Sequence, residues 1–505
     1  MIEAYRVDDV RAIEDRARAG LPDGELMRRA SRGLAQVAAA RLEERRGRRV
    51  VALVGKGDNG ADTLYAAGLL ASAGYPTVVV TVDRGAPDVA TESARADGVL
   101  VLLDDDDWAS VLAEADLVLD GLAGIGGWPG LRPAARAWVD AIPDDAWVMA
   151  VDLPSGADPA GETRPPDPAN LVHADETVTF SLAKPVHLLP ATEPAVGRLT
   201  VVDIGLDPHG FTPAVARLTF DDVARLWPVP DASSDKYSRG VVGIVAGSVT
   251  YPGAAVLSVL GALGAGPGMV RYLGPSDVRW LIHQQAPEVV TVEGRVQAWV
   301  IGSGFDPDPG SGFRSGSGSG SDSDGAIQQR DHALAALASD LPVVVDAGAL
   351  ALVDRREAPT LLTPHAGELA TLLTRLEAGP DGAGEVTRAA VTSSPLAHAR
   401  AAAERTGATV LLKGAHTLVV GPDPAAPVRC QADAPPWLAT AGAGDVLGGL
   451  LGTLLAAGLS PLDAGSVGAL VHGVAAERTS AGGPLRMTEV ARAIPATVAG
   501  LLTRG

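Results

Sequence analysis

Residues 438–452 read LATAGAGDVLGGLLG, so two glycines and a carboxylate stand at the start of an apolar run. Glycine is unfavourable inside a helix, and a carboxylate is unfavourable inside an apolar core. Both suit a helix N-terminus, where unpaired N–H groups carry partial positive charge and glycine lets the backbone approach an anion. Gly442, Gly444 and Asp445 therefore predict an anion pocket in which Asp445 takes a proton from a hydroxyl. A plain N-cap with a glycine turn is the alternative.

Short β-branched runs alternate with Ala- and Leu-rich stretches of helical length on the N-terminal side of this segment, the pattern of βαβ units around a mainly parallel sheet. In the second half we expect strands within 241–248, 269–274, 298–304, 342–350, 360–369 and 409–421. Two helical segments, separated by residues 459–465, are expected to close the chain. In the first half we expect strands within 49–55, 77–83, 99–103, 116–122, 147–153, 177–183 and 199–205.

The chain of 505 residues is too long for one ordinary core and suits two or three domains. Residues 206–235 are rich in Pro, Asp and Ser, which places a boundary near 212. We predict an α/β protein with a Rossmann-like domain at 1–212 and a second α/β domain at 213–505. Residues 309–325, a Gly/Ser/Asp tract, are expected to be a disordered insertion in the second domain, with a phosphorylated or partner-binding role as the other interpretation.

Composition excludes several classes of protein. A formal net charge of −20 argues against tracking a nucleic-acid backbone, which needs a basic face. The single cysteine, Cys430, builds neither a disulfide framework nor a thiolate metal cluster. The charged start lacks the apolar core of a signal peptide, and the longest apolar runs are short and rich in glycine. We expect a cytoplasmic homo-oligomer that binds small molecules and neither nucleic acid nor membrane.

An ordered series of motifs runs through the second half: KYSRG (236–240), AGSVTYPGAAVLS (246–258), GALGAGPGMV (261–270), IGSG (301–304), DAGAL (346–350), LTPHAGEL (362–369), LLKGAHTLV (411–419) and LATAGAGD (438–445). This series resembles the ADP- or ATP-dependent NAD(P)H-hydrate dehydratases of the ribokinase-like superfamily, over about residues 215–505. The resemblance implies a ribokinase-like fold. It also implies that hydrated NADH or NADPH is phosphorylated on its added hydroxyl by ADP or ATP with Mg²⁺, after which phosphate leaves.

The resemblance also assigns residues. It makes Asp445 the catalytic base, which also contacts the substrate. The nucleotide contacts are expected at Gly444, Lys413, Gly414, Ala415, His416 and Thr417, and the hydrated dinucleotide contacts at Ala254, Ala255, Gly304 and His365. Asp346, at a strand end, ranks below Asp445.

Ordinary structural roles remain open for several of these residues. His365 suits a turn, Lys413 an exposed strand end, the two alanines helix packing and Glu368 the first turn of a helix. A small-molecule kinase is the rival function, although Ala439 stands where such kinases usually carry an Asp.

A glycine-rich loop lies between a strand and a helix in VALVGKGDNGADTLYAAGLLASAG (51–74). Its glycine spacing, with Asp83 further on, matches a dinucleotide fingerprint, but that pattern alone is weak. Asp58, Asn59 and Asp62 would crowd a pyrophosphate and suit a cation or a sugar better. Asp120, Asp152 and Ser155 follow neighbouring strands, and such oxygens make a site for a hard cation. Three separate capped turns are the alternative.

This set resembles the NAD(P)H-hydrate epimerase domain, over about residues 1–212. The resemblance implies a K⁺ site at Asn59, Asp120 and Ser155. It places the hydrated dinucleotide at Asp58, Asn59, Gly60, Ala61, Asp62, Gly124, Ile125, Gly126 and Asp152. Either Asp62 or Asp152 is expected to help by acid/base catalysis.

The loop departs from the epimerase pattern at four positions. Asp58 stands where the pattern has Asn, Ala61 and Thr63 where it has Gly, and Ile125 where it has Thr. These departures leave a non-catalytic first domain as an alternative, since a Cβ at residue 61 narrows the approach of a ligand to the backbone. The whole chain is predicted to be a bifunctional repair enzyme that interconverts the R and S epimers at C6 and dehydrates the S form.

Overall fold

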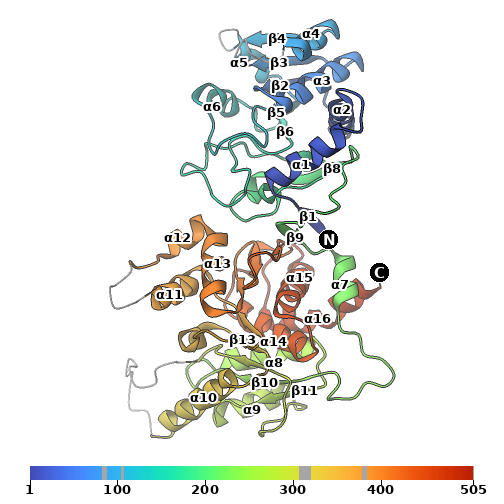
Figure 1. Ribbon diagram of the computed structural model, residues 1–505. Helices are drawn as coiled ribbons and strands as arrows, with labels where there is room; N and C mark the ends of the chain where they lie inside the picture. The colour runs from blue at the N-terminus through green and yellow to red at the C-terminus, as the bar shows by residue number, and fades with distance from the viewer. Residues whose placement is uncertain (82–87, 104–106, 306–319, 378–383, 504–505) are drawn as a thin grey trace. The chain divides into compact units, whose positions relative to one another are not determined.

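The computed structural model describes residues 1–81, 88–103, 107–305, 320–377 and 384–503 (Figure 1). The chain forms two compact units, Ile2–Val215 and Ala216–Gly505. The short strands β1 (Ile2–Ala4) and β9 (Val215–Arg217) lie near the two sequence ends of the first unit. No helix in the described part of the chain is long and apolar enough to cross a membrane.

The first unit is built on a parallel sheet of seven strands in the order β4-β3-β2-β5-β6-β7-β8. All seven fall within the β-branched runs that predicted them, or within one residue of them. Their bounds are β2 Val50–Val54, β3 Thr77–Thr81, β4 Leu100–Leu103, β5 Leu117–Gly121, β6 Trp147–Val151, β7 Glu176–Phe180 and β8 Arg198–Val202. Parallel pairing brings the carboxyl ends of these strands to one edge of the sheet.

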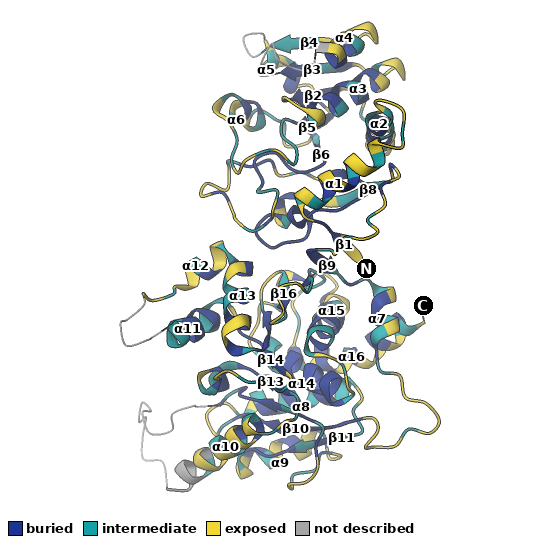
Figure 2. Cartoon of the chain, viewed as in Figure 1, coloured by how far each residue is buried: buried dark blue, intermediate teal, exposed yellow. Residues whose placement is uncertain are grey.

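Helices cover both faces of this sheet. Val50, Ala52 and Val54 of β2 pack with α1 to α4, whereas Val51 and Leu53 pack with α5 and α6, as the two-residue repeat of a strand requires. Figure 2 shows the central strands buried between the helices, whereas the edge strands β4 and β8 are more exposed. The helix bounds are α1 Val7–Arg18, α2 Glu25–Arg45, α3 Asp58–Ser72, α4 Asp88–Ala96, α5 Trp108–Leu112 and α6 Pro133–Asp140.

The second unit has a mixed sheet that runs in the order β17-β16-β15-β14-β13-β12-β10-β11. Pairing is parallel from β11 to β15 and antiparallel from β15 to β17. The bounds are β10 Val241–Val245, β11 Met269–Tyr272, β12 Ala298–Ile301, β13 Val343–Val345, β14 Thr360–Leu362, β15 Thr409–Leu412, β16 Thr417–Val420 and β17 Val428–Gln431. Both units therefore confirm the predicted α/β class.

The helices of the second unit include α14 (Ala443–Ala456), which begins in the opening motif of the sequence. Two of its glycines allow very close packing: a Cβ on Gly449 would lie 1.9 Å from the Ser258 carbonyl oxygen, and one on Gly452 would lie 2.1 Å from Val300. The remaining helices are α7 Phe220–Leu226, α8 Pro252–Gly264, α9 Ser276–Gln285, α10 Gly320–Ala338, α11 Ala366–Glu377, α12 Arg388–Ser393, α13 Pro395–Thr406, α15 Pro461–Ser480 and α16 Met487–Leu502. Gly449 and Gly452 thus allow α14 to pack closely against α8 and β12.

The structure corrects four of the expected segments. Residues 459–465 do not separate two final helices, because Ser460 caps α15 at Pro461, and a third helix, α16, follows Gly482 and Gly483. The segment 360–369 is a strand followed by the start of α11, and 409–421 is a hairpin of two strands. Of the expected insertion 309–325, residues 309–319 lie outside the described residues, whereas 320–325 begin α10. Extending a helix whose later turns are packed costs little.

Candidate active sites

The start of α14 is a cradle of backbone N–H groups. Gly442 caps the helix with φ +91°, a backbone conformation that an L side chain rarely adopts, and Asp445 stands in the first turn. The opening motif thus has its glycines and its carboxylate where the sequence predicted an anion pocket.

Side chains at the ends of four strands meet around Asp346, which follows β13 and is buried. Lys413, after β15, donates to the Asp346 carboxylate at 2.7 Å. Thr363, after β14, donates to it at 2.8 Å, and Ser303, after β12, at 3.2 Å. A second carboxylate, Glu368, lies 3.6 Å from Lys413 Nζ.

This cluster lies against the start of α14. A Cβ built on Gly444 would be 3.2 Å from Lys413 Nζ and 3.6 Å from the Asp346 carboxylate. Burial and then the charge of Asp346 raise the pKa of Asp445 to about 6, while Ser303 and Lys413 oppose the rise. Burial lowers the pKa of the Lys413 ammonium, but Asp346, Glu368 and Asp445 together raise it above its usual value. Lys413 therefore stays charged beside a carboxyl group that titrates close to neutral pH.

His365 immediately precedes α11 and has a structural role at its start. Its Nδ1 accepts hydrogen bonds from the N–H groups of Gly367 and Glu368, both at 3.1 Å, and Glu368 accepts from the His365 N–H at 2.8 Å. This reciprocal pattern resembles a capping box, with His365 in the place of the usual Ser or Thr. The His365 side chain is 59% exposed, so the ring also remains open to a ligand.

The remaining site residues of the second unit are those predicted to contact the dinucleotide and those predicted to contact the nucleotide. Gly304, with φ +66°, packs against α8, where a Cβ on it would lie 2.7 Å from the Ala254 Cβ. Ala255 is fully buried in the core, which accords with the alternative of helix packing for its side chain. Residues 414–416 form the turn between β15 and β16, and Thr417 begins β16.

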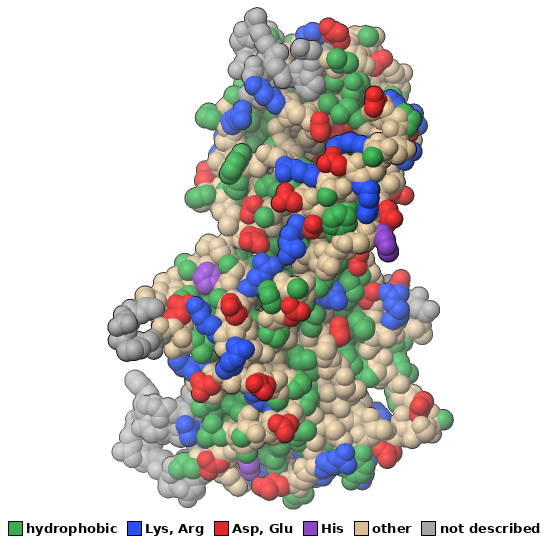
Figure 3. Space-filling model, viewed as in Figure 1, with side chains coloured by type: hydrophobic (Ala, Val, Ile, Leu, Met, Phe, Trp, Pro, Cys, Tyr) green, Lys and Arg blue, Asp and Glu red, His purple; other side chains and the backbone are tan. Residues whose placement is uncertain are grey.

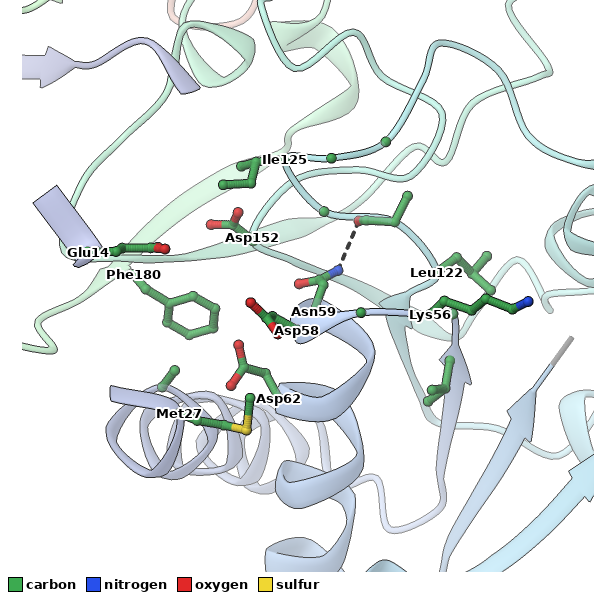
Figure 4. A pocket seen from close by; sticks show the side chains of 18 of the residues that line it. Glu14, Met27, Lys56, Asp58, Asn59, Asp62, Leu122, Ile125, Asp152 and Phe180 are labelled. Atoms are coloured by element: carbon green, nitrogen blue, oxygen red, sulfur yellow. Dashed lines mark hydrogen bonds between the residues drawn. The ribbon is translucent and has the colours of Figure 1, made fainter. Parts of the chain in front are cut away.

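A cavity of about 1040 Å³ opens in the first unit at the carboxyl ends of its strands (Figure 4). The predicted substrate residues that line it are Asp58, Asn59, Asp62, Gly124, Ile125, Gly126 and Asp152. Gly60 and Ala61 are buried in α3 and do not line the cavity. A role for these two in binding remains a prediction.

The three predicted cation ligands are joined through the backbone of Ala123. Asn59 Nδ2 donates to the Ala123 carbonyl at 2.9 Å, and the Ala123 N–H donates to Ser155 Oγ at 2.9 Å. Ser155 in turn donates to the fully buried Asp120 through its hydroxyl, at 2.6 Å, and through its N–H, at 2.8 Å. Burial raises the pKa of Asp120 to about 6 against these hydrogen bonds. Asn59 Oδ1 is buried and has no hydrogen-bond partner among the described residues.

The sequence analysis missed a buried cluster behind Asp152. Lys184 forms an ion pair with the Asp152 carboxylate, and Thr179 Oγ1 donates to the same oxygen at 3.0 Å. The ring of His187 contacts the Asp152 carbonyl oxygen through Nε2 at 2.7 Å. Lys184 is 2% exposed. A lysine within the largely apolar stretch SLAKPVHLL (181–189) was the available signal.

Carboxyl groups gather on the opposite wall of the same cavity. Asp62 on α3 lies near Glu14, Asp58 and Asp152, and Figure 4 shows the four carboxylates facing the same space. Burial first, and then these neighbouring charges, raise the pKa of Asp62 well above its usual value. Burial also raises the pKa of Glu14. The cavity thus holds acidic groups that keep their protons more readily than ordinary carboxyl groups do.

These features define the class: an α/β protein in which charged and polar side chains gather at the carboxyl ends of the parallel strands of each unit. On the face drawn in Figure 3, acidic and basic side chains are interspersed rather than gathered into a basic track. The family model described as NAD(P)H-hydrate dehydratase matches residues 242–495, and the model described as YjeF-related protein N-terminus matches residues 23–186.

Full-length relatives agree with both family models. The bifunctional NAD(P)H-hydrate repair enzyme Nnr of Mycobacterium tuberculosis is 42% identical, over 90% of this chain and 89% of the relative. That of Mycobacterium leprae is 41% identical, over 94% of each. The chain belongs to the family of bifunctional NAD(P)H-hydrate repair enzymes, as the motifs predicted. Among solved structures, the ADP/ATP-dependent NAD(P)H-hydrate dehydratase of Bacillus subtilis, co-crystallised with ATP/Mg²⁺, is 26% identical, with a TM-score of 0.47 over 57% of this chain and 99% of that one.

Proposed function

We propose that this chain repairs hydrated NADH and NADPH. The first unit interconverts the R and S epimers at C6, and the second dehydrates the S form at the expense of ADP or ATP. The observation that carries the proposal is the position of Asp445 in the first turn of α14, beside the Lys413–Asp346 pair. In the first unit, the hydrogen-bond network that links Asn59, Ser155 and Asp120 supports the epimerase assignment.

In the dehydratase site, Asp445 accepts the proton of the C6 hydroxyl while that oxygen attacks the terminal phosphoryl group of the nucleotide. The N–H groups at the start of α14 and the Lys413 ammonium stabilise the charge that develops on the phosphoryl oxygens. Phosphate then leaves C6, a proton leaves C5 and the ring double bond returns. Phosphorylation is needed because hydroxide is a poor leaving group and phosphate is a good one.

Magnesium would accompany the nucleotide and reduce the charge repulsion between its phosphates and the carboxylates of the site. Asp346 and Glu368 supply the hard oxygen atoms that such an ion prefers. Gly444 leaves open the space beside Lys413 that a Cβ would fill, which suits the close approach of a phosphate to the helix. We assign nucleotide binding to Gly444 and to residues 413–417, and dinucleotide binding to Ala254, Ala255, Gly304 and His365.

In the epimerase site, the donor set fits K⁺. In the part of the chain that the structure describes, Asn59 Oδ1 is a buried acceptor without a partner, and Asp120 is a buried carboxylate without a cationic neighbour. K⁺ held by Asn59, Asp120 and Ser155 would neutralise that carboxylate and order the turn at Ala123. The intact network favours a catalytic first unit over a degenerate one.

The recovery of absorbance at 340 nm from hydrated NADPH, supplied as mixed epimers with Mg²⁺ and ADP or ATP, tests the proposal. The wild-type chain should restore the full signal, with the R fraction recovered faster than it epimerises without enzyme. Asp445→Asn should lose about 10²-fold or more of the dehydratase rate. Recovery that stops at the S fraction would refute the epimerase assignment. No recovery with either nucleotide would refute the repair function and favour a small-molecule kinase.

A further inference from the structure

Two carboxyl groups that line the first-unit cavity have opposite surroundings. Asp152, at φ +67°, has the buried Lys184 ammonium on its carboxylate and a hydrogen bond from Thr179. In the described structure the Asp62 side chain has one hydrogen bond, a long one of 3.5 Å from Ser31, and its charged neighbours are carboxylates. The Asp152 carboxylate is thus paired with a cation, whereas the Asp62 carboxyl group is surrounded by negative charge.

We propose that Asp152 is the base and Asp62 the acid of the epimerisation, and that Lys184 is the positioning residue that fixes this division of roles. The inference rests on the epimerase function proposed above and goes beyond it by giving each group a direction of proton transfer. A carboxylate paired with a cation, close to a buried carboxyl group crowded by negative charge, is an arrangement suited to paired base and acid catalysis.

The proton transfers of the epimerisation balance with Asp152 and Asp62 alone. Asp152 removes the proton from the C6 hydroxyl, the C6–N1 bond breaks with its electrons passing to N1, and C6 becomes an aldehyde carbon. Asp62 gives its proton to N1, so the ring is open and the total charge is unchanged. Rotation about the C5–C6 bond presents the other face of the aldehyde. N1 then attacks C6, returns its proton to Asp62, and the new C6 oxygen recovers a proton from Asp152.

The charges around Asp62 support its role as the acid. The groups that face it are Glu14 on α1, Ser31 on α2, Asp58 on α3 and Asp152 after β6. Arg18 on α1 contacts Glu14 at 3.2 Å and Asp58 at 4.0 Å, and no ion pair joins it to Asp62 in the described structure. Burial and the three carboxylates raise the pKa of Asp62, so that it retains a proton to donate.

The segment that carries Lys184 contacts both the side-chain carboxylate and the backbone carbonyl of Asp152. The Lys184 N–H donates to His187 Nδ1 at 3.0 Å, so Nε2 carries the ring proton and donates it to the Asp152 carbonyl oxygen. Burial lowers the pKa of His187 to about 4, which keeps the ring neutral in this role. Lys184 contacts the side chain of Asp152 while His187 contacts its backbone. The pair of contacts explains how a non-glycine residue is kept at a positive φ at the cavity wall.

The test uses the full chain, whose own dehydratase reports on the R epimer. With mixed epimers, the fast phase at 340 nm measures dehydration of the S form, and the slow phase measures conversion of R to S. Asp62→Asn and Asp152→Asn, both close to isosteric, should slow the second phase by about 10²-fold or more and leave the first unchanged. Glu114→Gln, an exposed residue on the same unit, is the matched charge control and should change neither phase.

Lys184 needs a measurement that a purely structural role would not affect. Lys184→Met should lower kcat for R conversion more than it raises KM, and its slow-phase rate should reach a maximum at a higher pH than in the wild type, because the Asp152 carboxylate has lost its cation. Lys184→Arg should restore most of the rate. A decrease in wild-type slow-phase rate with rising pH, absent from the residual rate of Asp62→Asn, would identify Asp62 as the acid.

The outcomes distinguish an error in the acid and base assignment from an error in the epimerase function on which it rests. If the wild-type slow phase equals enzyme-free epimerisation, the epimerase function itself is wrong. If the wild type accelerates it and Asp62→Asn stays within about threefold of the wild type, the acid assignment is overturned. If Lys184→Met is unstable, Asp62→Asn and Asp152→Asn still decide the acid and base. Lys184→Arg then decides the positioning role: a slow-phase rate and pH profile close to those of the wild type support it, and a rate as low as that of Asp152→Asn overturns it.

Discussion

The Lys413 ammonium lies 2.7 Å from the Asp346 carboxylate, although their strands, β15 and β13, are not neighbours and β14 lies between them. The lysine therefore reaches across the end of a strand. It also lies 3.6 Å from Glu368 and influences the charge of Asp445. The Lys413 ammonium thus interacts electrostatically with three carboxyl groups at the edge of the sheet. Its removal is expected to change the charge environment of all three.

The pH dependence of dehydration should report Asp445. A base works when ionised, and the pKa of Asp445 is raised to about 6, so kcat/KM should fall as pH falls through about 6. Lys413→Met removes a charge that opposes this rise, so the fall should begin at a higher pH and the maximum rate should also drop. Lys413→Arg should keep the wild-type profile more closely. An unchanged pH profile in Lys413→Met would show that the lysine does not tune Asp445.

Gly444 should be required for phosphate binding rather than for folding. In Gly444→Ala the new Cβ would lie 3.2 Å from Lys413 Nζ, in the space assigned to a phosphoryl group, so nucleotide KM should rise and kcat should fall by about tenfold or more. Gly448→Ala, one turn later, is the matched control, since its Cβ would be 3.7 Å from Val300, an ordinary contact. Both variants should unfold at or above the wild-type urea concentration, because alanine favours a helix. Equal kinetics for the two variants would contradict the assignment.

The strands were predictable because parallel strands buried on both faces must be runs of apolar, often β-branched residues. β2 with VVALV and β13 with VVV are recognisable from composition alone. β17 (VRCQ) was missed because a short antiparallel strand with polar positions has no such run. The end of the chain was misread because α14 and α15 are buried on most of their surface and lack a clear helical periodicity, although the buried positions of α16 do follow one.

Some residues of the two candidate sites could be predicted from the sequence, and others could not. Residues that a parallel sheet must bring to one edge, such as Asp346 and Lys413 or Asp120 and Ser155, could be predicted to converge, since topology alone fixes that edge. Lys184 could not be paired with Asp152 from sequence, because the pair depends on how one irregular segment folds back over a strand end. The burial that raises the pKa of Asp62 is likewise a property of the packed structure.

Potassium should stabilise the first unit through Asp120. Thermal unfolding in KCl and in tetramethylammonium chloride at equal ionic strength should differ for the wild type, because K⁺ binds the folded site and not the unfolded chain. Asp120→Asn should abolish the difference. Asp116→Asn is the control, since Asp116 lies just before the start of the same strand and accepts hydrogen bonds from the N–H groups of Arg48 and Arg49. It should lower the unfolding temperature in both salts equally. A K⁺ effect that survives Asp120→Asn would place the ion elsewhere.

Ala61, one of the departures from the epimerase pattern, should affect stability rather than activity. Its side chain is 5% exposed and packs in the core beside Leu64, and it does not line the cavity. Ala61→Gly should therefore lower the free energy of unfolding by about 1–2 kcal/mol, from lost helix propensity and a lost buried methyl group. Ala71→Gly, near the end of the same helix and only half-buried, should cost less in urea unfolding. The slow phase of the 340 nm assay should stay within about twofold of the wild type in Ala61→Gly, since no atom at the cavity wall is removed. A markedly faster slow phase would mean that the Cβ of Ala61 does obstruct the ligand, and that the departure impairs epimerisation.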